Sequence, residues 1–171
     1  MTTLPHILHS SMQIPKRLCK ASVTLFNDKI IDGEFFLSHA SSRHDGAETL
    51  PELLNDNTRD FVPFTVEHNT LLLSRPAIRS VVFESPDLMD LFGDPENEHI
   101  YPLEVVFRTE TQEVALNGVC CTAELRPERR RPVDLLNEPG MFLLVFSDGY
   151  LTLLNKNAIS HIDLHVNSKG S

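Results

Sequence analysis

The densest group of side chains that could bind a ligand is a run of arginines in the second half of the chain. Its members are Arg126, Arg129, Arg130 and Arg131. Guanidinium groups bind phosphates and carboxylates through paired hydrogen bonds, so this loop could hold a phosphorylated ligand or an acidic partner. The alternative is a solvated loop that pairs with the acidic residues of the segment before it, namely Asp94, Glu96 and Glu98.

Histidines and cysteines do not form a recognisable metal or catalytic set. His161 and His165 are four residues apart, which on a strand separates them by about 13 Å, too far to share one ion. The cysteines, Cys19, Cys120 and Cys121, lack the Cys-x-x-Cys spacing of zinc sites. Neither a Gly-x-Ser-x-Gly nor a His-Glu-x-x-His motif occurs, and there is no phosphate-binding glycine loop. We therefore expect no enzymatic activity, no cofactor and no metal.

Cysteine usage also indicates a compartment. The number of cysteines is odd, and the adjacent Cys120 and Cys121 would point to opposite faces of a strand, so a disulfide between them is geometrically poor. This usage is typical of a reduced, intracellular protein. The N-terminus lacks the pattern of a secretory signal, and no apolar run is long enough to span a membrane. We expect a cytoplasmic protein that does not contact membranes.

The overall charge bears on the class of partner. The formal net charge is −9, and a strongly acidic surface repels phosphate backbones. Affinity for nucleic acids comes largely from Lys and Arg contacts to phosphates. The charge therefore does not favour nucleic-acid binding.

A short motif, Leu-Leu-Asn, occurs twice and marks an internal repeat. It occupies residues 53–55 and 135–137, an offset of 82 (137 − 55). Residues after each copy match at an offset of 81: Phe61 with Phe142, Leu73 with Leu154, and Ile78 with Ile159. Two copies of one module explain this pattern, and because each is small we expect them to pack on each other. The predicted division is an N-terminal arm (1–18), a first module (19–84), a linker (85–100), a second module (101–167) and a tail (168–171).

Alternating apolar residues predict that both modules are mainly β. Residues 19–37 and 101–122 each fit a hairpin, the first with a turn at Asn27-Asp28. Gly33 and Gly118 take the same place in the two return strands, where glycine permits a sharp bend. Asp148-Gly149 predicts a two-residue hairpin turn. Further strands are predicted over residues 61–66, 71–83 (two strands around a turn), 141–146, 150–154 and 158–166.

Each Leu-Leu-Asn motif is predicted to form a short helical turn. Thr49 precedes Pro51 and Glu52 in the arrangement of a helix N-terminus, and Asn55 is suited to end the turn. The leucines would then point toward the interior of the module. On that interpretation, Leu54→Ala and Leu136→Ala should each cost about 2–5 kcal/mol of stability.

The linker between the modules is predicted to contain a helix of about two turns. It starts at Ser85-Pro86 and stops at Gly93. Leu88, Leu91 and Phe92 form its apolar side. This side could dock into the groove of a protein partner, or it could pack between the two modules.

The order of these elements resembles the Sm-like small β-barrel family. A hairpin with a glycine in its second strand is followed by a polar insert, a second hairpin and a short last strand. Residues 71–83 (LLLSRPAIRSVVF) and 151–164 (LTLLNKNAISHIDL) are similar to the end of such a domain. The Leu-Leu-Asn turn is similar to that of bacterial domains of unknown function with this barrel. The resemblance implies a five-stranded, strongly bent sheet in each module.

Two ligand classes follow from resemblance alone. Sm-like proteins that bind RNA carry an Arg-Gly in the closing turn, whereas the corresponding turns here, 74–76 and 155–157, contain no glycine. The spacing of Arg126 and Arg130 resembles the Arg-x-x-x-Arg half of the PilZ pattern, which in that family binds cyclic dinucleotides. The other half of that pattern has no match after Arg130.

The sequence therefore predicts a mainly β protein made of two tandem small bent-sheet barrels with short helical turns and a short linker helix. The function it favours is a non-enzymatic intracellular interaction or regulatory protein of bacterial type. Its partner would be a protein, including a second copy in a homodimer. The alternatives are a phosphate-ligand sensor that uses the arginine loop, and Sm-like RNA binding.

Overall fold

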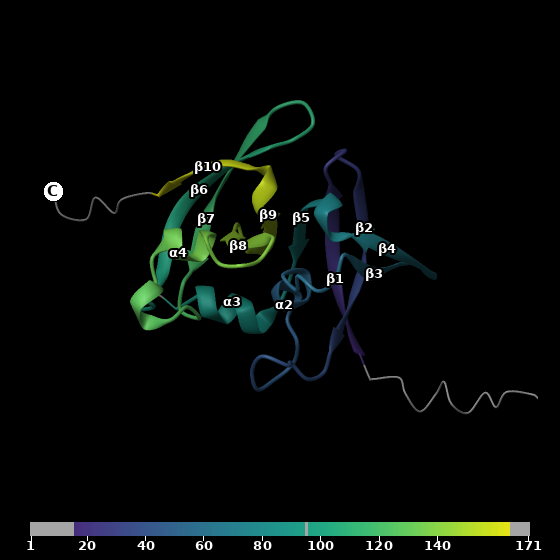
Figure 1. The fold of residues 1–171 in the computed structure, drawn as a ribbon, viewed down its shortest axis with the longest axis horizontal. Helices are drawn as coiled ribbons and strands as arrows, with labels where there is room; N and C mark the ends of the chain where they lie inside the picture. The colour runs from purple at the N-terminus through teal and green to yellow at the C-terminus, as the bar shows by residue number, and fades with distance from the viewer. Residues whose placement is uncertain (1–15, 95, 165–171) are drawn as a thin grey trace, which may run out of the picture.

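The computed structural model describes residues 16–94 and 96–164 (Figure 1). Most of the predicted N-terminal arm, the predicted tail and His165 lie outside these residues. The arm was predicted to reach residue 18, but the first strand already begins at Lys16. Alternation of exposed and covered residues extends from Lys16, so residues 16–18 belong to the sheet and not to an arm.

The described residues form one antiparallel sheet of ten strands, and the prediction of a mainly β protein is confirmed. The strands are β1 (Lys16–Leu25), β2 (Ile30–Ser38), β3 (Phe61–Val66), β4 (Asn69–Ser74), β5 (Ile78–Phe83), β6 (Ile100–Arg108), β7 (Glu113–Cys121), β8 (Phe142–Ser147), β9 (Tyr150–Asn155) and β10 (Ile159–Leu164). Three short α-helices accompany them: α2 (Leu50–Leu54), α3 (Pro86–Phe92) and α4 (Pro132–Leu136). The single-turn 3₁₀ helices are η1 (Arg75–Ala77), η2 (Pro127–Arg129) and η3 (Lys156–Ala158).

The order of elements in the first half of the chain recurs in the second half. Two strands, a short helix, a hairpin, a 3₁₀ turn and a last strand occur as β1 to β5 and again as β6 to β10. The spatial order recurs too: β5-β1-β2-β3-β4 and β10-β6-β7-β8-β9. The two groups of strands lie side by side, and in the view of Figure 1 α3 lies below the second group, with α2 beside it toward the first. They are joined because β5 pairs with β9.

A glycine lies at a close backbone approach in each half. Gly33 pairs with Ala21, and Gly118 pairs with Leu103, near the middle of the long hairpins β1–β2 and β6–β7. A Cβ at Gly33 would collide with the carbonyl oxygen of Thr65, and one at Gly118 would collide with the carbonyl oxygen of Phe146. Both glycines therefore allow a close approach of the following hairpin, whereas a bend at these positions stays a prediction.

The predicted hairpin turns are confirmed. Asp148 and Gly149 have φ of 51° and 81°, as a type I′ turn requires, and Ser147 pairs with Tyr150 across it. Asp28, in the turn between β1 and β2, also adopts a positive φ of 64°. Asp tolerates this conformation better than most side chains do.

The two Leu-Leu-Asn motifs form α2 and α4, but only the first is buried. Thr49 accepts a hydrogen bond from the backbone of Glu52 and so caps α2, whose Leu53 and Leu54 are buried. No residue of α4 is fully buried, and Leu136 is half-covered. The expectation of equal burial was therefore wrong. The second half of the chain covers α2, since strand β8 packs against it, and no described element covers α4 to the same extent.

The hydrophobic core extends across both halves. One cluster combines Val23, Phe35 and Leu54 of the first half with Phe142 and Leu153 of the second. A smaller cluster contains only second-half residues: Leu103, Val105, Cys120, Leu143, Val145 and Leu154. The first half thus depends on side chains from the second to complete its interior.

A matched pair of truncations tests this asymmetry. Leu54 and Leu136 stand at equivalent positions, but Leu54 is fully buried and Leu136 is only half-covered. Leu54→Ala should lower the free energy of unfolding by about 2–5 kcal/mol, and Leu136→Ala by clearly less. Urea denaturation followed by circular dichroism measures both. Equal losses would show that the two helices are equally buried.

Candidate interaction surfaces

The junction between β5 and β9 joins the two halves of the sheet and shows how this chain pairs two edge strands. Val81 lies opposite Leu153, and Phe83 lies opposite Leu151. All four side chains are buried. The junction therefore combines a hydrogen-bonded ladder with a dry apolar contact.

Two asparagines add side-chain hydrogen bonds to this junction. The amide of Asn55 donates from Nδ2 to the carbonyl of Phe142 (3.3 Å), and its Oδ1 accepts from the backbone N–H of Phe142 (2.8 Å). The buried Asn155 donates from Nδ2 to the carbonyl of Ile78 (2.8 Å). Gly140 lies beside the first contact, where a Cβ would be only 3.0 Å from the Asn55 Oδ1. A glycine at this position therefore leaves room for the asparagine.

The second surface is the edge of the sheet formed by β4. Within the described residues β4 pairs only with β3, so its outer side has no strand beside it. Leu71 and Leu72 on β4 are 38% and 70% exposed, and Phe61 on the neighbouring strand is 58% exposed. Strand β4 contains neither a charged residue nor a proline. Natural edge strands commonly use such residues to prevent association.

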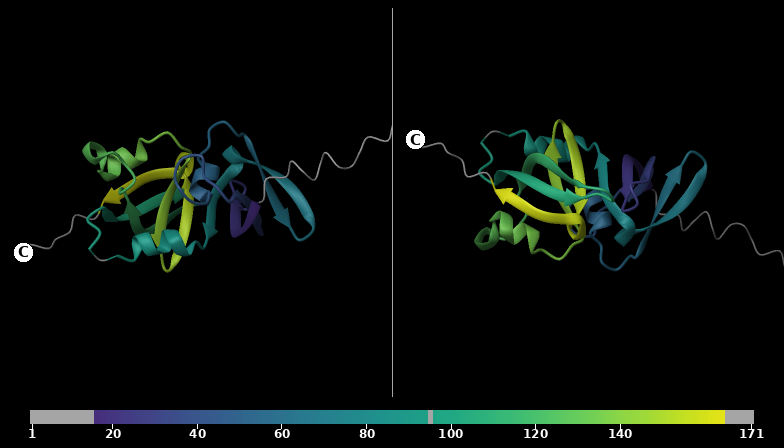
Figure 2. Two further views of the ribbon diagram at one scale, coloured as in Figure 1. Left: turned by 90° about the horizontal axis from the view of Figure 1, so that it is seen from below. Right: turned by 90° about the horizontal axis from the view of Figure 1, so that it is seen from above.

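The opposite edge of the sheet is β10. It pairs with β6, and among the described strands it has no second neighbour. Leu164 is exposed, Ile162 is half-covered, and the polar residues His161 and Asp163 are exposed beside them. Figure 2 shows the β3–β4 hairpin at one end of the molecule and β10 at the other.

The arginine loop uses two of its four guanidinium groups for local contacts. Arg131 donates to both carboxylate oxygens of Asp134 at 3.0 and 3.2 Å, and this hydrogen bonding lowers the pKa of Asp134. Arg130 donates to the carbonyl of Leu125 (2.9 Å), and its Nη1 lies 3.1 Å from His99 Nε2.

The other two arginines are exposed: Arg126 precedes the 3₁₀ turn η2, and Arg129 is its last residue. Arg131 makes its ion pair with Asp134, and across the described residues no ion pair joins this loop to the acidic segment 94–98. That predicted pairing was therefore wrong. Binding of a phosphorylated ligand by the loop stays a prediction.

The linker helix α3 turns most of its apolar side inward. The ring of Phe92 is buried and stacks on Phe146, with centroids 5.5 Å apart and planes inclined by 16°. Leu88 packs against the core cluster shared by both halves. Leu91 is half-covered and lines a groove. Of the three residues predicted to dock a partner, Phe92 is thus covered by the chain itself, and docking through Leu88 and Leu91 stays a prediction.

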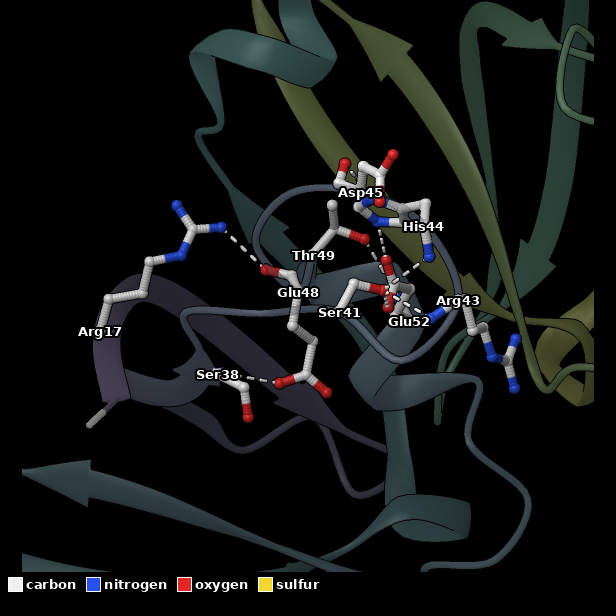
Figure 3. A network of polar contacts seen from close by, with 9 residues as sticks. All are labelled: Arg17, Ser38, Ser41, Arg43, His44, Asp45, Glu48, Thr49 and Glu52. Carbon is white, nitrogen blue, oxygen red and sulfur yellow. Dashed lines mark hydrogen bonds and ion pairs between the residues drawn. The ribbon is translucent and has the colours of Figure 1, made fainter. Parts of the chain in front are cut away.

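A polar network organises the loop between β2 and α2 (Figure 3). Ser41 Oγ donates to Glu52 Oε2 (2.7 Å) and accepts from the backbone N–H groups of Arg43 and His44. The imidazole of His44 contacts the carboxylate of Glu52 through Nε2 and the carbonyl of Asp45 through Nδ1. The Asp45 carbonyl is the main cause of a raised pKa for His44, to which Glu52 also contributes.

This network contains a serine, a histidine and a carboxylate, but in an order unsuited to nucleophilic catalysis. A catalytic serine donates its proton to the imidazole base, which in turn is oriented by the carboxylate. Here the Ser41 hydroxyl donates to Glu52 directly. The hydrogen bonds instead hold the loop against α2.

An open groove of about 890 Å³ lies beside this loop. Its walls come from the loop, from α3 and from the start of β8, and include Arg43, Glu52, Leu91 and Phe142. None of the four arginines of the loop 126–131 lines it. Its basic side chains are Arg17, Arg43 and Lys156, and its acidic side chains are Asp45, Glu52, Asp87, Glu124 and Glu138. This acidic excess does not favour an anionic ligand.

The three cysteines are all free. Cys120 is buried in β7, and desolvation, followed by the neighbouring Cys121, raises its pKa to about 12. Such a thiol is a poor nucleophile at neutral pH, because the thiolate is the reactive form. Within the described residues no cluster of three or more metal-ligating side chains occurs.

No family model, curated protein or solved structure matches this chain. None of the described helices is both long and apolar enough to cross a lipid bilayer.

The exposed apolar residues of the β4 edge were not predicted as a site from the sequence. Leu72 and Phe61 have the residue types and spacing of Leu153 and Phe142, which are buried. Residue type could not distinguish the exposed copy from the buried one. The available signal was the strand itself, which is mostly apolar and uncharged.

The buried thiol gives a chemical test of the β7 environment. At pH 8, four units below a pKa of about 12, only about one Cys120 in ten thousand is a thiolate. We expect iodoacetamide to leave Cys120 unmodified in the folded protein and to alkylate it in urea, as read by peptide mass spectrometry. Rapid alkylation of Cys120 without denaturant would contradict the burial.

Proposed function

We propose that this protein is a non-enzymatic intracellular interaction or regulatory protein, built from a duplicated small β-barrel of the Sm-like type. On this proposal it acts in the cytoplasm and binds a protein partner through the β4 edge. The observation that supports it most is the exposure of Leu72 and Leu71 on an edge strand that carries no charge or proline, with Phe61 exposed on the strand beside it. The recurrence of the element order supports the duplication.

The mode of binding proposed is the addition of a partner strand along β4. Covering Leu72 and Phe61 would contribute about 3 kcal/mol or somewhat more. Association costs more than this, on the order of 4–15 kcal/mol. Apolar contact alone is therefore insufficient, and the partner must also form hydrogen bonds with the free N–H and C=O groups of β4. Strand addition supplies both contributions at once.

A charge placed on the edge tests this proposal. In Leu72→Glu the partner would have to bury an unpaired carboxylate, so binding should weaken by at least about tenfold. Quantitative affinity capture from extracts of the source cells, read by mass spectrometry, compares the variant with the wild type. Since Leu72 is 70% exposed, the substitution should leave the fold intact.

Ile30→Glu is the matched control, because Ile30 is an aliphatic residue of similar exposure (64%) on β2. It should retain every partner that the wild type captures. If wild type and both variants capture the same proteins in the same amounts, β4 is not the binding surface.

A further inference from the structure

The groove beside the β2–α2 loop has an apolar floor that the chain leaves partly uncovered. Five half-covered leucines line it: Leu88 and Leu91 on α3, Leu125 after β7, Leu135 on α4 and Leu144 on β8. They come from four separate segments of the chain, and only the fold brings them to one concave surface. Partly covered apolar side chains gathered in a hollow are typical of sites that bind an apolar group of a ligand.

Exposed carboxylates surround this floor. Those that line the groove and are exposed are Asp45, Asp87, Glu124 and Glu138. Among the described residues none of these four takes part in an ion pair. Glu52, the fifth acidic residue of the lining, is instead engaged by Ser41 and His44 (Figure 3). Charges of one sign around a groove with apolar walls attract ligands of the opposite sign.

The chain itself already uses two of the three basic side chains of the lining. Arg17 donates from Nη2 to the carbonyl of Glu48 (2.8 Å), and Lys156 donates from Nζ to the carbonyl of Glu138 (2.8 Å). Lys156 also lies near the carboxylate of Glu138, which acts on its charge. The remaining exposed acids, Asp45, Asp87 and Glu124, are therefore the ones best placed to meet positive charges brought by a ligand.

A second hollow of about 860 Å³ continues this concave surface along β1. The two hollows share Arg17, Thr49, Ser85 and Asp87 in their walls. The second hollow also has an acidic excess, with Asp32, Glu34, Glu84 and Asp87 against Arg17 and Lys20. Each hollow alone has the size of a large small-molecule site. Because the two adjoin and carry the same sign of charge, they suit a polymer better than one compact small molecule.

We propose that this groove binds a basic segment of another polypeptide. Its aliphatic side chains would lie on the leucine floor, and its Lys or Arg side chains would pair with Asp45, Asp87 and Glu124. The site goes beyond the proposed function and does not rest on it, because none of the lining residues belongs to β3 or β4.

The floor and the rim contribute differently to such binding. Ion pairs at exposed positions are screened by water and salt, so each changes the affinity by only about two- to fivefold. Burial of aliphatic groups on the leucine floor therefore supplies most of the affinity. The carboxylates mainly select the partner, because they repel acidic segments and attract basic ones.

Isothermal titration calorimetry of the full chain with three short synthetic peptides of equal length tests the proposal. The first peptide alternates Leu with Lys, the second Ser with Lys, and the third Leu with Glu. The Leu–Lys peptide should bind with a Kd at or below about 100 µM. The Ser–Lys peptide lacks apolar groups and should bind at least about tenfold more weakly. The Leu–Glu peptide should not bind, because its charges repel the rim.

A double charge reversal, Asp87→Lys with Glu124→Lys, locates the bound peptide. It turns attraction into repulsion at two positions of the rim, so the Leu–Lys peptide should bind at least about tenfold more weakly. The matched control is Glu110→Lys with Asp163→Lys, which changes the net charge equally at two exposed residues outside both hollows. It should bind within about twofold of the wild type, since distant charges are screened. All four positions are exposed, and circular dichroism melts check that both variants fold.

Leu72→Glu separates this site from the β4 edge, where an alternating peptide could add as a strand. It should bind the Leu–Lys peptide as the wild type does. If the substitution abolishes binding, the peptide occupies β4 and the groove proposal fails while the proposed function gains support. If the groove proposal fails in any other way, the proposed function still stands on its own test.

Four further results would overturn the groove proposal. The first is that the Leu–Lys peptide does not bind. The second is that the Ser–Lys or the Leu–Glu peptide binds equally well, which would show attraction by charge alone or by apolar contact alone. The third is that the double charge reversal binds like its control. The fourth is that the protein associates with itself and the same reversal abolishes this association, since a second copy would then fill the groove.

Discussion

The pairing of β5 with β9 is the contact on which the rest of the structure depends. It joins two five-stranded groups into one sheet of ten strands and brings Phe142, Leu151 and Leu153 into the core of the first half. A group of five strands of this size buries a small fraction of its surface and is only marginally stable alone. Sharing a core removes that difficulty for the first half, and Asn55 fixes the register by bonding both backbone groups of Phe142.

The same contact explains why two similar halves have different surfaces. Elements α2 and β5 of the first half pack against β8 and β9 of the second half, so these elements cover one another. The corresponding elements of the other half are β3 and β4 in the first half and α4 and β10 in the second. Among the described residues they make no such contact with the other half. Because the element order recurs and the two halves meet at one asymmetric junction, the element that is covered in one half is open in the other. This arrangement explains why apolar residues are exposed on β3, β4 and β10, whereas their counterparts in the other half are buried.

Much of the fold was accessible from sequence, for local reasons. Asp148-Gly149 predicted its turn because few residue pairs adopt two positive φ angles, and Ser85-Pro86 with Gly93 bounded α3 because caps act within one turn of helix. Gly33 and Gly118 were recognisable as special positions through their matching places, and each lies where the backbone of the next hairpin comes too close for a Cβ. The prediction failed where residue type carried no information on environment: Leu54 and Leu136 look alike, and only one is buried.

The sequence by itself determined the strands, their turns and the repeated order, because these follow from backbone propensity, alternation and capping between near neighbours. Only the tertiary structure decided which copy of each repeated feature is inside. That choice depends on β5 meeting β9, a contact between residues 68 to 74 positions apart in the chain, and no local pattern specifies it. Leu72 and Leu153 are the same residue in the same setting of their hairpins, and the presence of a neighbouring strand alone makes one of them core and the other surface.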